Sequence, residues 1–175
     1  MKHFSIQAPE TRRMLNEWIM FRFLREEKLI SLNYDFINVS INGSNKGIYA
    51  IEQSFDHKLL ASNHKDIGPI IKISDDLFVD YNLYSKGQVN TQEDIMHMSE
   101  IDCFLTKKTF KSKKLRDQFI KAQALMKSFI SGKIELDSAL DVNSFAKLYA
   151  ISELLSCYHA LRWKNFRAYY NPKSE

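Results

Sequence analysis

A strand pattern in the first third of the chain constrains its fold more than any other feature. Residues 34–41 alternate between apolar and polar side chains, and a similar apolar pattern resumes at residues 48–51. Alternation with a period of two is typical of a half-buried strand. Asn42 and Gly43 open the polar segment 42–47 between the two runs, and both readily take the positive φ angles of tight hairpin turns. We therefore predict a β-hairpin.

Helical and extended patterns alternate around this hairpin. Before it, residues 9–27 carry apolar side chains at three- and four-residue intervals, with a proline at the start, which predicts one buried helix. After it, residues 55–64 predict a short helix. The apolar run 70–73 follows Gly-Pro and predicts a third strand, in which Lys72 is the single charged residue.

The second half of the chain is mostly helical in pattern. Residues 74–106 show no clear periodicity and predict a long, partly irregular connection. Helices are predicted over 110–130 and from about 141 to 158, and a strand over 165–170 before an Asn-Pro turn. The predicted class is α+β, with a β-hairpin and a third strand packed with several helices.

The composition limits the class of protein. The chain has 175 residues, 45% hydrophobic and 26% charged, which is enough for one domain with its own core. No window approaches the roughly 20 apolar residues of a membrane span, so none is expected. Cys103 and Cys157 lie far apart with no paired spacing, which argues against structural zinc and against a disulfide framework.

A basic run begins near residue 107, in a chain whose net charge is only +4. It has no interleaved aromatic platform for stacking bases and no nucleic-acid-binding signature, so a nucleic-acid partner is not favoured over a solvated helix start. A surface for an acidic partner on a non-catalytic α+β protein stays open as a weaker alternative. The run consists of Lys107, Lys108, Lys111, Lys113, Lys114 and Arg116.

The standard motifs of nucleotide-binding and hydrolytic enzymes do not occur, but a longer series of motifs does carry information. The series comprises Ile41-Asn42-Gly43, Gly47-Ile48-Tyr49-Ala50-Ile51-Glu52, Gly68-Pro69-Ile70-Ile71-Lys72, His159, and Asn165-x-Arg167-x-Tyr169-Tyr170-Asn171-Pro172. In this order the residues resemble the CotH kinase family, the kinases related to spore-coat protein H. The resemblance runs from about Phe4 to Pro172.

The resemblance implies an atypical protein-kinase-like fold of bacterial origin that binds ATP with Mg²⁺ or Mn²⁺ and phosphorylates Ser or Thr on a protein substrate. Lys72 is then expected to bind the nucleotide phosphates, with Glu52 as its ion-pair partner, and Asn165 to bind the metal. Each residue also has a plainer interpretation. Lys72 and Glu52 can be solvated strand residues, and Asn165 can cap the start of a strand.

His159 departs from the family pattern, because many members have an aspartate that looks like the catalytic base at this position. Histidine can accept a proton near neutral pH. The alternatives are a kinase that uses His159 instead, a degenerate pseudokinase that acts as a scaffold, or a purely structural role for His159.

The family's acidic metal-binding motif would follow Pro172. We therefore expect residues 1–175 to form a single partial domain, truncated at both ends and inactive alone, in which the strand 166–170 has no partner. The compartment is left open.

Overall fold

The computed structural model describes residues 3–85 and 92–174, which divide into two compact units. The first unit comprises residues 1–65 and 146–158, and the second comprises 66–145 and 159–175. Each unit contains one three-stranded antiparallel sheet and several helices. The predicted α+β class is confirmed, while the single partial domain stays a prediction.

The predicted hairpin forms the sheet of the first unit. Strands β2 (Tyr34–Ile41) and β3 (Ser44–Gln53) are antiparallel, and Ile41 faces Ser44 across a two-residue turn. Asn42 and Gly43 have φ angles of 51° and 78°, as a type I′ turn requires. A third strand, β1 (Phe4–Gln7), pairs with the other edge of β3 and was not predicted.

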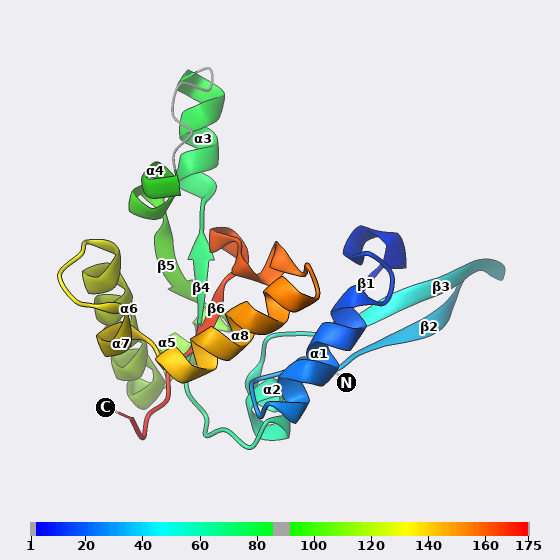
Figure 1. The fold of residues 1–175 in the computed structure, drawn as a ribbon, viewed down its shortest axis with the longest axis horizontal. Helices are drawn as coiled ribbons and strands as arrows, with labels where there is room; N and C mark the ends of the chain where they lie inside the picture. Colours follow the sequence, from blue (N-terminus) through cyan, green and yellow to red (C-terminus); the bar gives the residue numbers. More distant parts are fainter. Residues whose placement is uncertain (1–2, 86–91, 175) are drawn as a thin grey trace. The chain divides into compact units, whose positions relative to one another are not determined.

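The predicted helix over 9–27 is wrong at one point. The chain forms a short 3-10 helix, η1 (Pro9–Arg12), and then α1 (Asn16–Glu26), which Figure 1 shows beside the hairpin. Arg13 and Met14 between them have φ angles of 52° and 59°, in the left-handed region, so they interrupt the helix. The short helix predicted next is confirmed as α2 (His57–Ser62), capped by the Asp56 carboxylate.

The predicted third strand is β4 (Ile70–Ser74), the central strand of the second unit's sheet (Figure 1). The prediction of an irregular connection over 74–106 is wrong. That segment includes α3 (Asp76–Ser85), α4 (Gln92–Met98) and the edge strand β5 (Glu100–Cys103); residues 86–91 lie outside the described residues.

The expectation of an unpartnered strand near the end of the chain is also wrong. Strand β6 (Arg167–Tyr169) pairs with the free edge of β4, with Ile70 opposite Tyr169. Gly68 permits this arrangement, because a Cβ atom there would lie 2.6 Å from the backbone oxygen of Tyr170.

Helix α6 (Lys113–Ile130) covers one face of the second sheet and builds the core of this unit. Ser112 caps its first turn, and its apolar residues recur at intervals of three and four. The buried cluster comprises Ile71, Ile73, Ile101, Cys103, Phe119, Ala122 and Met126.

The other described helices are α5 (Thr106–Lys111), α7 (Leu136–Ala139), α8 (Val142–Leu154), η2 (Tyr158–Leu161) and η3 (Trp163–Asn165). From Ala146 onward, the residues of α8 belong to the first unit. Within the described residues, no helix has both the length and the apolar content that crossing a membrane requires.

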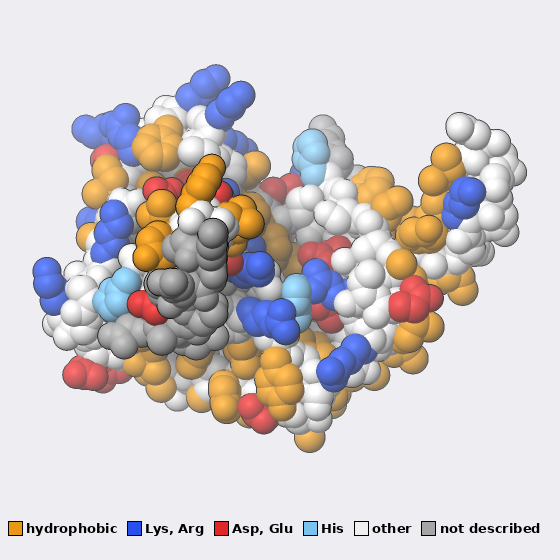
Figure 2. Space-filling view, turned by 90° about the horizontal axis from the view of Figure 1, so that it is seen from above, with side chains coloured by type: hydrophobic (Ala, Val, Ile, Leu, Met, Phe, Trp, Pro, Cys, Tyr) orange, Lys and Arg blue, Asp and Glu red, His pale blue; other side chains and the backbone are white. Residues whose placement is uncertain are grey.

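The basic run covers α5 and the first turn of α6, and its lysines are exposed. Figure 2 shows Lys and Arg side chains in small groups, separated by uncharged side chains, on the face that it presents. A surface for an acidic partner on α5 and α6 stays a prediction.

Candidate functional site

Three charged residues form a row across the second sheet. Lys72 on the central strand faces Asp102 on β5 and Arg167 on β6 in the strand register. Ile71 and Ile73, on either side of Lys72, are buried in the core, so strand alternation directs Lys72 to the opposite face. The Lys72 Nζ lies 3.1 Å from the Asp102 Oδ2, and the two side chains are 37% and 39% exposed. The pair is therefore accessible to a ligand.

Arg167 is held more rigidly than Lys72. Its Nη1 donates to the backbone oxygens of Lys164 at 2.7 Å and Phe166 at 2.8 Å, and its Cζ lies 5.3 Å from the ring centroid of Phe104. Burial lowers the pKa of the guanidinium from its ordinary value, although an arginine stays charged near neutral pH. The row thus has one cation fixed by backbone oxygens beside one cation that is paired with a carboxylate and stays partly exposed.

His159 and Asn165 lie next to each other just before β6. The Asn165 Nδ2 donates to the backbone oxygen of His159 at 3.1 Å, and this hydrogen bond links the end of η3 to η2. Two further contacts attach η3 to neighbouring parts of this unit. Trp163 Nε1 donates to Ser99 Oγ at 2.8 Å, and Lys164 Nζ lies 3.7 Å from the carboxylate of Asp75, which follows β4. The structure brings these two predicted site residues together.

Glu52 belongs to the first unit, whereas Lys72 belongs to the second, so their predicted ion pair stays a prediction. Within its own unit, Glu52 lies on β3 and its Oε2 accepts a hydrogen bond from Gln7 Nε2 at 3.4 Å. Burial raises the pKa of the Glu52 carboxyl, and the nearby charge of Arg12 partly opposes this effect. The interpretation of Glu52 as a plain solvated residue is thus weakened.

Glu17 shares this environment and was missed in the sequence. Its Oε1 lies 3.6 Å from the Nε of Arg12, and its side chain is only 14% exposed. Burial raises the Glu17 pKa to about 7, with Arg12 lowering it and Glu52 raising it further. The first unit therefore holds two carboxyl groups and one guanidinium in a poorly hydrated position, where a proton can be exchanged near neutral pH.

Asp102 was also missed, because it lies in the segment for which the sequence predicted no regular structure. The available signal for a strand was the alternation of polar Glu100 and Asp102 with apolar Ile101 and Cys103. Four residues are too few for such a periodic pattern to stand out in the sequence. The carboxylate that pairs with Lys72 in the structure is therefore one that the sequence did not single out.

No group of three or more His, Cys, Asp or Glu side chains lies close enough to hold a metal ion among the described residues. Asn165 offers one amide oxygen, a ligand type that Mg²⁺ accepts. Its role as a metal ligand stays a prediction.

Comparison with known proteins gives one result. The family model described as "CotH kinase protein" matches residues 7–174. Searches of curated proteins and of solved structures gave no significant match. Because the family model covers nearly the whole chain, including both units and all four predicted site residues, this protein belongs to the CotH kinase family.

Proposed function

We propose that this chain is an ATP- and divalent-metal-dependent protein kinase domain that transfers a phosphoryl group to Ser or Thr of a protein partner. Membership of the family supports a kinase-like domain. The observation that carries the proposal is the accessible ion pair of Lys72 and Asp102 on the central strand of a sheet. A lysine held by a carboxylate, and still open to solvent, suits the binding of nucleotide phosphates.

In this proposal, Asp102 positions the ammonium group of Lys72, which then binds the phosphate oxygens of ATP. Arg167, the fixed cation in the same row, adds positive charge where the phosphates lie. Glu52 is the residue that the family resemblance assigns to the nucleotide site as an ion-pair partner of Lys72. Mg²⁺ or Mn²⁺, when bound, neutralises phosphate charge, and Asn165 is the proposed ligand from this chain.

The transfer itself requires a base near the acceptor hydroxyl. The hydroxyl oxygen of the substrate Ser or Thr forms a bond to the γ-phosphorus as the bond between that phosphorus and the β–γ bridging oxygen breaks, which releases ADP. The hydroxyl proton passes to the imidazole of His159. Its exposed position before η3, where its backbone oxygen holds Asn165, leaves room for a protein substrate.

Transfer of labelled phosphate from ATP to a protein substrate, in the presence of Mg²⁺ or Mn²⁺, tests the proposal. Lys72→Ala should reduce transfer by about 100-fold, because one well-placed charged group contributes that much to a transition state. The substitution should change stability by only about 0–1 kcal/mol, since the ion pair is largely solvated.

Lys133→Ala is the matched control, because Lys133 is exposed in the same unit. It should leave transfer unchanged. His159→Ala should abolish transfer if the imidazole is the base. Equal transfer by Lys72→Ala and wild type would refute the assignment of Lys72.

A pseudokinase scaffold is the second candidate, and His159 favours it because the family pattern has an aspartate there. This alternative predicts that the folded protein binds nucleotide but transfers no phosphate. Transfer that depends on Lys72 excludes it.

A further inference from the structure

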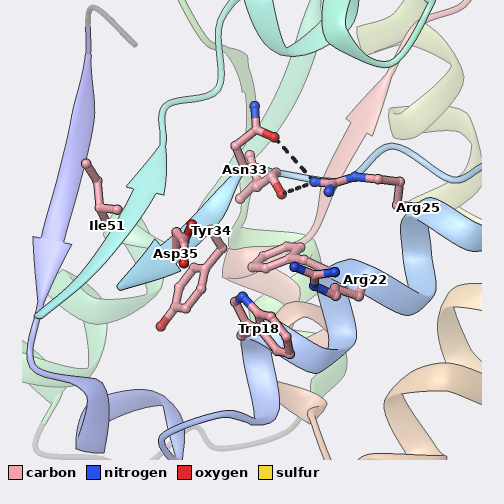
Figure 3. Close-up of a pocket in the computed structure, with 9 residues that line it drawn as sticks. Trp18, Arg22, Arg25, Asn33, Tyr34, Asp35 and Ile51 are labelled. Atoms are coloured by element: carbon pink, nitrogen blue, oxygen red, sulfur yellow. Dashed lines mark hydrogen bonds between the residues drawn. The ribbon is translucent and has the colours of Figure 1, made fainter. Parts of the chain in front are cut away.

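A pocket of about 220 Å³ opens beside α1 and the start of β2, within the first unit (Figure 3). Its apolar lining includes the half-buried Trp18 and Phe21 of α1 and the buried Leu32 and Tyr34. Pockets for drug-sized ligands and cofactors measure about 300–1,000 Å³. This pocket is therefore too small for a nucleotide, but it suits a single inserted side chain.

Two arginines of α1 form the polar side of this pocket. The Cζ of Arg22 lies 4.2 Å from the ring centroid of Trp18, in a cation–π contact that orients the guanidinium. Arg25 Nη2 lies 3.3 Å from the Asn33 Oδ1 and 3.5 Å from the backbone oxygen of Leu32 (Figure 3). Both guanidinium groups are thus held in place while their side chains remain exposed.

Neither arginine forms an ion pair with a carboxylate among the described residues. The pocket also includes Asp35, whose Oδ1 accepts a hydrogen bond from the amide of Phe36 at 2.9 Å. Two arginines and one aspartate leave the pocket with a charge of +1. An oriented guanidinium with donors to spare is suited to a carboxylate or phosphate.

We propose that this pocket binds an acidic segment of a protein partner. An apolar side chain of the segment enters against Trp18 and Tyr34, and a neighbouring carboxylate accepts hydrogen bonds from Arg22 and Arg25. The small volume selects the inserted side chain, and the net positive charge selects its acidic neighbours. The pocket requires no phosphoryl transfer, so it goes beyond the proposed kinase function and would operate in a scaffold as well.

The test uses a fluorescein-labelled peptide, Gly-Gly-Glu-Phe-Glu-Glu-Gly-Gly, and measures its binding by fluorescence anisotropy at low salt without ATP. Wild type should bind this peptide at least about tenfold more tightly than a peptide with Lys in place of every Glu. Replacing Phe by Ala in the peptide should also weaken binding. Weak or equal binding of all three peptides would overturn the proposal.

Substitutions in the protein locate the site. Arg22→Glu with Arg25→Glu should weaken binding of the acidic peptide by about tenfold or more, and should improve binding of the lysine peptide. Lys46→Glu, the same charge change on the exposed end of β3, is the matched control and should have little effect.

The double variant loses the contacts of Arg25 with Asn33, so its folding requires a check by circular dichroism. Two other variants keep those contacts. Arg22→Glu alone should still weaken binding severalfold. Asp35→Asn removes a repelling charge and should tighten binding about two- to threefold. Unchanged affinity in both variants would place the peptide elsewhere and refute the site.

Discussion

Glu17 should make the stability of the first unit decrease as the pH rises through neutrality. Its pKa is raised from 4.5 to about 7, mainly because burial disfavours the charged carboxylate. A carboxyl whose pKa is higher in the folded state binds more protons when folded, so folding is favoured at low pH. This stabilisation is fully present below about pH 4.5 and is lost as the pH rises to about 7.

The magnitude follows from the size of the shift. A difference of about 2.5 pKa units corresponds to about 3 kcal/mol across the window, with a slope of at most about 1.4 kcal/mol per pH unit. Other titratable groups face Glu17. The pKa of the Glu52 carboxyl is also raised by burial, and adds to the slope in the same direction.

The remaining neighbours do not change charge in this window. Burial raises the pKa values of Tyr34 and Cys157 above ordinary values that already lie above pH 8. Among the groups that face Glu17, the decrease in stability with rising pH therefore comes from the two glutamates.

Glu17→Gln isolates the effect, because glutamine matches the shape of a neutral glutamic acid and cannot ionise. Between pH 4.5 and 8, the unfolding free energy of the variant should gain about 3 kcal/mol relative to wild type. Urea titrations at several pH values measure it. The fluorescence of Trp18, which follows Glu17 in α1, reports on this unit when both proteins carry Trp163→Phe.

Glu26→Gln is the matched control, since it makes the same substitution at an exposed glutamate of the same helix. Parallel pH profiles for wild type and Glu17→Gln would refute the reasoning. They would show that the Glu17 carboxylate is solvated or fully compensated by Arg12 at neutral pH.

Two further predictions concern stability. Asn63→Ala should destabilise the first unit by about 2–3 kcal/mol, and urea unfolding measures the loss. The Asn63 side chain accepts a hydrogen bond from the amide of Ser31 and donates to the backbone oxygens of Ser31 and Leu59, at 2.8–3.0 Å. Gly68→Ala should destabilise the second unit by about 1–3 kcal/mol, because its Cβ would meet the backbone of Tyr170 at 2.6 Å; a thermal midpoint equal to that of wild type would contradict this expectation.

Local interactions explain what was predictable. The hairpin of β2 and β3 depends on strand alternation and on the φ angles that Asn42 and Gly43 accept, and these are properties of adjacent residues. Lys72 was recognisable as the one charge in an apolar strand. The family resemblance rests on the same local motifs, and the family model confirms it.

The parts of the candidate site that were missed depend on contacts between distant residues. Arg12 and Glu17 would lie on different faces of one continuous helix. The left-handed residues Arg13 and Met14 break that helix and bring the two side chains together. Asp102 could not be assigned to Lys72, because pairing between strands so far apart in the sequence has no signature in either strand alone.

The sequence by itself determined the α+β class, the hairpin, the strand that carries Lys72 and the membership of the CotH kinase family, because each depends on a pattern of neighbouring residues. Only the tertiary structure decided which carboxylate pairs with Lys72, which strand pairs with β6, and that two arginines of α1 lie beside an apolar pocket. The physical reason is that pairing, burial and the resulting charge environment are set by residues brought together from separate segments.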